Sequence, residues 1–273
     1  MPFVSERSDD FILQLRTLVH NLRLIDSLGD SVDLSSLEWV SPLTTLPLAA
    51  TLYRKGRKVS GSSSYLQTVH FPHGVDEVQS WRAGQTYFPI LKFSTQAVAD
   101  LERLTYGFAR LVLQSLGPTG NYIRNAWFYA VDELITNIAE HSQSPLGWIH
   151  AQYYPTKGIL DAVVLDQGRG FRKTYEESHR VAYTDQQAIR LALQGRSVKD
   201  DVERGKGLRT TKALVTQSAL NGKFLIISGG CGFYAETTKQ TWLNLGDWQW
   251  KGAIIAFRIN RVNKAVDIYP YVE

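Results

Sequence analysis

The sequence predicts an α+β protein whose helices and strands are concentrated after about residue 94. Apolar residues recur every three to four positions over residues 95–116 and 122–140, which is the spacing of amphipathic helices. With 273 residues, 44% of them hydrophobic and 21% charged, the chain has the composition of a globular protein with a buried core. Short apolar runs typical of strands follow at residues 147–154, 159–165, 223–228, 232–237 and 253–259.

The first third of the chain predicts a smaller α/β unit. Residues 11–25 have helical spacing, residues 31–34 are a strand candidate, and residues 43–52 form an apolar helix with Pro47 in its first turn. A strand-like pattern at residues 85–93 closes this unit. We therefore expect a domain boundary near residue 93, with one domain at 1–93 and another at 94–273.

Composition excludes several classes of protein. Cys231 is the only cysteine, so an intrachain disulfide and a cysteine-rich zinc site are excluded. Residues 1–10 lack the apolar core of a signal peptide, and the apolar stretch 43–52 is too short to cross a bilayer. We therefore expect a cytoplasmic protein with no membrane contact. The formal net charge of +4 is only weak evidence for a polyanionic partner.

The first motif consists of Glu133, Asn137 and His141, which are four residues apart and stack on one helical face. A carboxamide oxygen such as that of Asn137 is a neutral, hard ligand suited to Mg²⁺. A carboxylate one turn away, Glu133, can accept a proton from an attacking water or hydroxyl. A polar stripe at the edge of an amphipathic helix explains the same residues, and this motif alone leaves both interpretations open.

The second motif, Asp166-Gln-Gly168-Arg-Gly170, directly follows the apolar run 159–165. A carboxylate at a strand end can accept a hydrogen bond from the amino group of adenine, whereas guanine presents a carbonyl there. Gly168 and Gly170 lack a Cβ, which lets the backbone approach a flat base. An ordinary strand-end turn also uses aspartate and glycine.

The third motif, Gly205-Lys206-Gly207-Leu208, opens a predicted helix at 208–219. Backbone N–H groups at a helix start can bind an anion, and Lys206 or Arg204 would add positive charge against phosphates. A flexible glycine turn that caps a helix is the alternative.

The order and spacing of these motifs resemble the N, G1 and G2 boxes of the GHKL ATPase superfamily. The stretch Ala130-Val-Asp-Glu133-Leu-Ile-Thr-Asn137, with His141, is most similar to the anti-sigma-factor serine kinase branch, and the resemblance covers residues 95–260. It implies a Bergerat α/β sandwich, in which helices cover a mixed sheet, and the cofactors ATP and Mg²⁺ bound beneath a lid at about 172–204.

The resemblance also implies roles for single residues. Asn137 would hold Mg²⁺, Glu133 would be the general base, and Asp166 would recognise adenine. For His141 a ligand role and a structural role stay open, and Arg209 replaces a glycine of many relatives, which puts the mobility of the lid in doubt. The remaining positions would frame the base or contact the phosphates: Gly168, Gly170, Arg204, Gly205, Lys206, Gly207 and Leu208.

In the first third, residues 32–43 and 64–71 are similar to a STAS domain, the fold of anti-anti-sigma factors. The phospho-acceptor serine of that family would fall near Leu43, where Ser41, Thr44 and Thr45 are neighbours but not clean matches. We therefore expect no phosphorylated switch here, and an α/β domain that only packs against the ATPase stays open.

Together these features predict a Mg-ATP-binding regulatory protein, either an anti-sigma-type serine/threonine kinase or a slow ATPase. The alternative is a non-catalytic module in which ATP orders the lid and a partner-binding surface. A sensor histidine kinase is disfavoured because His20 lacks the acidic and proline context of a phospho-accepting histidine, and a nucleic-acid-processing ATPase because only about a dozen residues follow the matched region. A protein partner is expected on the STAS-like part or the lid, and homodimerisation through residues 95–116 stays open.

Overall fold

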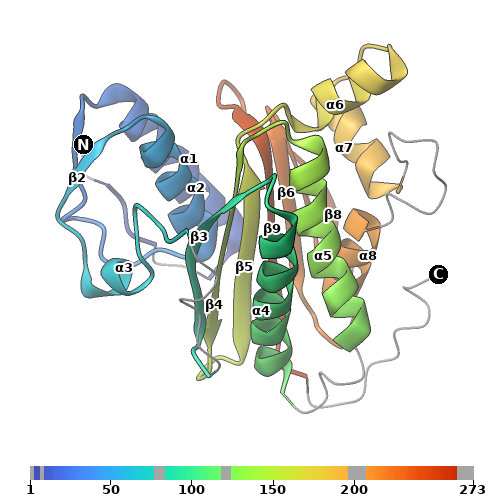
Figure 1. The fold of residues 1–273 in the computed structure, drawn as a ribbon, viewed down its shortest axis with the longest axis horizontal. Helices are drawn as coiled ribbons and strands as arrows, with labels where there is room; N and C mark the ends of the chain where they lie inside the picture. The colour runs from blue at the N-terminus through green and yellow to red at the C-terminus, as the bar shows by residue number, and fades with distance from the viewer. Residues whose placement is uncertain (1–2, 7–8, 77–83, 118–123, 196–206, 263–273) are drawn as a thin grey trace.

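The computed structural model describes residues 3–6, 9–76, 84–117, 124–195 and 207–262. At its centre lies a seven-stranded sheet with the strand order β3-β4-β5-β9-β6-β7-β8. The α+β class is therefore confirmed (Figure 1). The strands are β3 (Tyr87–Ser94), β4 (Leu146–Tyr154), β5 (Ile159–Asp166), β6 (Lys223–Gly229), β7 (Cys231–Ala235), β8 (Gln240–Asn244) and β9 (Trp250–Asn260).

The expectation of a mixed sheet is wrong for these strands, because every pair is antiparallel. Short turns join β4 to β5 and link β6, β7 and β8 in succession, and such turns connect antiparallel neighbours. The last strand, β9, then enters between β5 and β6 and runs opposite to both.

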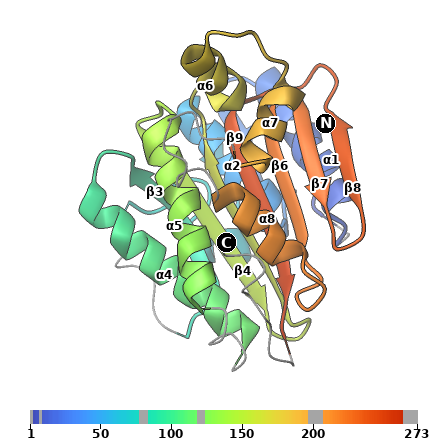
Figure 2. The same cartoon turned by 90° about the vertical axis from the view of Figure 1, so that its right-hand side faces the viewer.

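Five helices cover one face of the sheet (Figures 1 and 2). A capping box begins α7, since the Thr184 side chain accepts from the Gln187 N–H while the Gln187 side chain accepts from the Thr184 N–H. The mostly polar α6 is not predicted by the sequence pattern. The helices are α4 (Val98–Leu116), α5 (Arg124–His141), α6 (Gly170–His179), α7 (Asp185–Leu193) and α8 (Gly207–Thr216).

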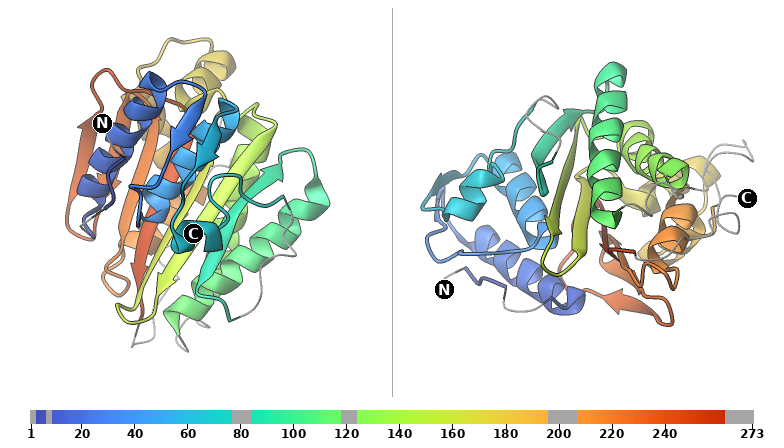
Figure 3. Two further views of the ribbon diagram at one scale, coloured as in Figure 1. Left: turned by 90° about the vertical axis from the view of Figure 1, so that its left-hand side faces the viewer. Right: turned by 90° about the horizontal axis from the view of Figure 1, so that it is seen from below.

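The N-terminal segment, which is the described part of residues 3–76, covers the opposite face (Figures 1 and 3). Two helices, α1 (Phe11–Ser27) and α2 (Pro42–Arg54), pack there, with α2 lying against β4 and β5. A parallel pair of short strands, β1 (Ser31–Asp33) and β2 (Lys58–Ser60), and the helix α3 (Ser64–Thr68) complete this segment.

The position expected for Pro47 is wrong. The helix α2 begins at Pro42, so Pro42 takes the position in the first turn where a missing N–H costs nothing, and Pro47 lies inside the helix. The start of α2 is capped by Glu6, whose buried carboxylate accepts from the Ser41 N–H at 2.9 Å and from the Ser41 Oγ at 3.1 Å. Burial raises the pKa of Glu6, although these hydrogen bonds oppose the shift.

Alternation along the inner strands produces two separate cores. In β5, Leu160, Ala162 and Val164 belong to the core beneath α4 and α5, whereas Val163 and Leu165 belong to the core beneath the N-terminal segment. The same alternation occurs in β6 and β9. Antiparallel sheets commonly leave one face in water, but here apolar side chains on both faces are covered.

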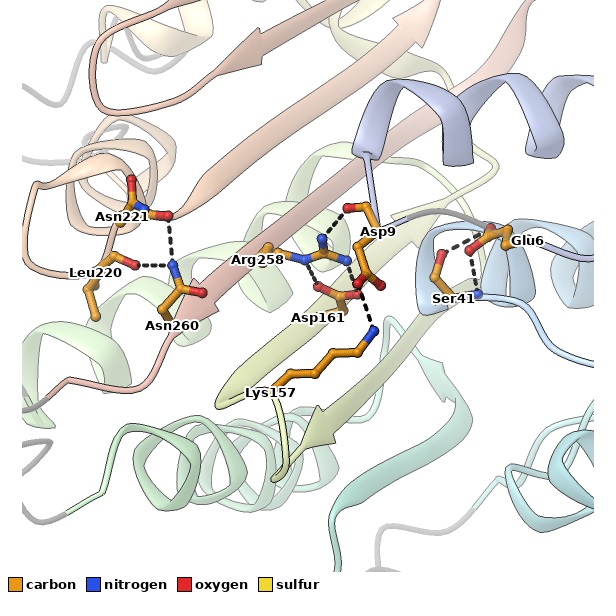
Figure 4. Close-up of polar contacts among 9 residues, drawn as sticks. All are labelled: Glu6, Asp9, Ser41, Lys157, Asp161, Leu220, Asn221, Arg258 and Asn260. Carbon is orange, nitrogen blue, oxygen red and sulfur yellow. Dashed lines mark hydrogen bonds and ion pairs between the residues drawn. The ribbon is translucent and has the colours of Figure 1, made fainter.

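A buried ion pair between β9 and β5 also contacts the N-terminal segment (Figure 4). Arg258 of β9 binds Asp161 of β5 through two parallel contacts, from Nε at 2.5 Å and from Nη2 at 2.6 Å. The third nitrogen of Arg258 donates to the Asp9 carbonyl, and the guanidinium lies 5.0 Å from the ring centre of Phe11. Lys157 binds the Asp9 carboxylate at 2.7 Å. These contacts fix the chain just before α1.

The boundary expected near residue 93 falls inside β3, which pairs with β4 in the same sheet as the later strands. Every helix in the described ranges falls short of the length and apolar character that a bilayer-spanning helix needs.

Candidate functional site

The first motif lies on α5, as its spacing predicts. One face of this helix is apolar and buried, and it includes Trp127, Leu134, Ile135 and Ile138. Glu133, Asn137 and His141 lie at four-residue steps beside that face and are all half-buried. The stripe is therefore partly accessible rather than sealed in the core.

The start of α8 lies directly against Glu133. A Cβ built at Gly207 would lie 2.3 Å from the Cβ of Glu133 and 2.5 Å from its Oε2, so only glycine fits at this position. The Glu133 carboxylate also accepts a hydrogen bond from Tyr129, and burial together with this carboxylate raises the pKa of the Tyr129 phenol. The third motif thus meets the first at Glu133.

The second motif meets the other end of α5. A Cβ built at Gly168 would lie 1.9 Å from the Ser142 carbonyl oxygen, just beyond the helix. Arg169 donates from its backbone N–H to this same oxygen at 2.8 Å and from its Nε to the His141 carbonyl at 2.8 Å. The loop after β5 therefore caps the free carbonyls at the end of α5.

Asp166 is the most deeply buried carboxylate of the three motifs, with 4% of its surface exposed. Its Oδ1 accepts from the Gly168 N–H at 2.7 Å, and its backbone carbonyl accepts from the Trp250 indole N–H at 3.0 Å. Burial raises the pKa of Asp166 from its ordinary value of 3.8 to about 6, although hydrogen bonds from Gly168 and Ala253 oppose the shift.

Two residues beside this loop were not expected from the sequence. Gly252 has a positive φ of 101°, and a Cβ there would lie 2.3 Å from the Asp166 carbonyl oxygen. Ser228 donates from Oγ to the Gly252 carbonyl at 2.7 Å and accepts from the Phe171 N–H at 3.2 Å. Their strands are separated by more than 50 residues from the motif, so no sequence spacing could have linked them to Asp166. A Cβ at Gly170 would lie 2.7 Å from the Ser228 Oγ, so this position also favours glycine.

The structure thus places Gly207 against Glu133 of α5 and Gly168 against Ser142 just beyond the end of the same helix. Asp166 and Gly170 belong to the same loop as Gly168, and their own close contacts are with β9 and β6. The side chain of Leu208 is 5% exposed and part of the core, so a phosphate contact at this position would have to come from its backbone. Arg204, Gly205 and Lys206 lie outside the described residues.

The segment expected to be a lid, 172–204, contains most of α6 and all of α7 in its described part. Asp185, the first residue of α7, accepts from the Gly230 N–H at 2.9 Å and pairs with Arg172 at 3.7 Å. This part of the segment is therefore tied to the turn between β6 and β7.

Substituting Gly168 by alanine is expected to destabilise the protein by about 1–3 kcal/mol, because the new methyl group overlaps a backbone oxygen. Urea unfolding followed by circular dichroism measures the change. Gly29→Ala is the matched control, since a Cβ at Gly29 meets nothing within 4 Å. Equal unfolding midpoints for the two variants would contradict the close contact between Gly168 and Ser142.

Comparisons of the chain with models of known protein families, with curated proteins and with solved structures find no match.

Proposed function

We propose that this chain is a Mg-ATP-binding regulatory protein of the GHKL type, with the Bergerat arrangement of α5, β5 and α8. One observation carries the proposal. The backbone of Gly207 lies directly against Glu133, and the backbone of Gly168 lies directly against Ser142. The second and third motifs therefore both pack against α5 or the residue that follows it. Motifs spread over residues 133–207 in the chain therefore meet at a single helix, as one binding site requires.

The chemistry of Asp166 fits an adenine site. Its carboxylate is buried at a strand end, and such a group needs hydrogen-bond donors to compensate for its desolvation. The backbone N–H groups of Gly168 and Ala253 supply only part of this compensation, because the pKa of Asp166 stays raised, at about 6. An exocyclic amine would supply a further donor, and a guanine carbonyl would not.

The polar groups on and beside α5 suit a magnesium-bound triphosphate. Within the described part of the chain, no hydrogen bond to the Asn137 carboxamide is found, and its half-buried oxygen is of the type that Mg²⁺ prefers. The start of α8 lies one turn away, where backbone N–H groups favour phosphate oxygens. Bound Mg-ATP would supply a phosphoryl group whose charge the metal neutralises.

Glu133 is the residue proposed to accept a proton from a water or a protein hydroxyl. Tyr129 donates a hydrogen bond to it and so orients the carboxylate. The same geometry serves a serine/threonine kinase and a slow ATPase. A protein partner on the N-terminal segment, which we propose to be STAS-like, or on residues 172–204 completes the proposal.

The test is a thermal-shift titration of the wild-type chain with ATP, ADP and GTP in the presence of Mg²⁺. ATP at a hundred times its dissociation constant should stabilise the protein by about 2.7 kcal/mol, and GTP should have a much smaller effect. Asp166→Asn should remove the response to ATP, whereas Glu102→Gln, an exposed carboxylate of α4, should keep it. Equal responses to ATP and GTP would refute the role of Asp166.

A second arm separates the enzyme from the non-catalytic module. With labelled ATP, phosphate release or protein labelling should fall at least about a hundredfold in Glu133→Gln while ATP binding is kept. If ATP binds and no turnover depends on Glu133, the chain is the non-catalytic module and the catalytic role of Glu133 is wrong.

A further inference from the structure

A groove lies between α1 and the edge strand β8, on the face of the sheet opposite the candidate nucleotide site. Its volume is about 450 Å³. The floor is apolar and includes Val19, Leu243 and Leu245, all of which are half-buried. Figure 3 shows α1 running alongside this edge of the sheet.

The strand β8 is an open edge. Among the described strands it pairs with β7 alone, so the backbone groups on its other side have no partner strand. Proteins usually protect such edges with charged residues, proline or a bulge. Residues 240–244 contain no charged residue and no proline, and the pairing of β8 with β7 has no register shift. The edge is therefore suited to receive a further strand.

The rim of the groove is basic. Arg16, His20 and Arg23 follow each other at four and three residues on α1, so they share one face, and all three are exposed. Within the part of the chain that the structure describes, neither arginine forms an ion pair. By contrast, Lys55 and Arg57 nearby in the N-terminal segment are paired with Asp26 and Asp30. The rim thus presents uncompensated positive charge beside an open strand edge.

On the other face of β8, Trp242 is half-buried against Phe233, and Arg190 lies 5.6 Å from its ring centre. A strand added to β8 would point alternate side chains toward the basic rim on α1 and toward Trp242. Carboxylates suit the first set of positions, and apolar side chains suit the second.

We propose that this groove binds an extended segment of a partner protein in which glutamate alternates with apolar residues, and that the segment pairs with β8 as an eighth strand. Backbone hydrogen bonds supply affinity, and Arg16 and Arg23 select the acidic positions. The methylene groups of the glutamates cover Val19 and Leu243. This interaction does not depend on the binding of nucleotide.

The test uses a fluorescent peptide of eight residues in which glutamate and valine alternate, and an isomer in which the four glutamates precede the four valines. Fluorescence anisotropy with the full chain should show binding of the alternating peptide and at least about tenfold weaker binding of the isomer, because the isomer cannot place its carboxylates on one face. The double variant Arg16→Glu/Arg23→Glu should weaken binding of the alternating peptide by at least about tenfold. The double variant Arg103→Glu/Arg110→Glu, at two exposed arginines on α4, makes the same change of net charge; it is the matched control and should leave binding unchanged.

Hydrogen exchange provides an independent readout, because strand addition should slow exchange of amides in residues 240–244. Equal binding of the two peptides would show that net charge alone determines the affinity, and it would overturn the proposal. So would unchanged affinity in the double variant. If sedimentation shows a dimer of the chain that the peptide disrupts, or if a single-stranded oligonucleotide displaces the peptide, the groove belongs to a second copy or to nucleic acid and the proposal fails.

Discussion

Arg258→Met is expected to lower the free energy of unfolding by about 3–5 kcal/mol, because it leaves the Asp161 carboxylate buried without its counter-charge. The side chains are only 5% and 2% exposed, so water cannot replace the lost contacts. Burial raises the pKa of Asp161 and the guanidinium opposes this shift, so removing Arg258 favours the protonated acid. Urea denaturation at pH 7, followed by circular dichroism, measures the loss.

Two further variants show whether the pair itself causes the loss. Arg258→Met combined with Asp161→Leu removes both charges, and it should recover most of the lost stability because apolar residues often replace a buried pair at little cost. Lys157→Met breaks the exposed pair with Asp9 and should cost at most about 1 kcal/mol. A double variant no more stable than Arg258→Met would show that packing rather than charge is responsible.

The second large effect concerns the pH dependence of Asp166. Its pKa in the folded protein is raised to about 6 by burial, so the folded state binds a proton more tightly than the unfolded chain does. The favourable contribution of this group is therefore complete below its ordinary pKa of 3.8 and is lost as the pH rises through about 6. Over the whole window the change is about 3 kcal/mol.

The measurement compares the wild-type chain with Asp166→Asn, both without nucleotide. The stability of the wild type relative to this variant should fall by about 2 kcal/mol between about pH 4.5 and pH 7.5. A difference that stays constant across this range, or that grows with pH, would contradict the desolvation of Asp166.

Regular apolar patterns allowed much of the fold to be predicted. The helix predicted at residues 95–116 ends at the same residue as α4, and the predicted strand at residues 159–165 differs from β5 by one residue. The helix α6 was missed because only Thr174 and Tyr175 of its ten residues are buried, so no apolar period marks it. The edge strand β8 was missed because a strand with one partner needs few apolar residues.

The candidate site was predictable where its residues share one helix or one loop. Glu133 and Asn137 are one turn apart, and local geometry alone places them on the same face. The contacts of Asp166 with Trp250 and Gly252 depend on the insertion of β9 beside β5, which is a property of the whole sheet. The antiparallel course of the strands was missed for the same reason, since pairing direction is not encoded in any single strand.

The sheet with two covered faces has a consequence for comparing this chain with relatives. Leu225, Ile227 and Ile254 are buried because the N-terminal segment lies over them. A related chain without that segment would hold these side chains in water, where polar residues would be favoured at the same positions. The residues at alternate positions along β6 and β9 therefore indicate whether a homologue has kept its N-terminal segment, even where the sequence of that segment has diverged past recognition.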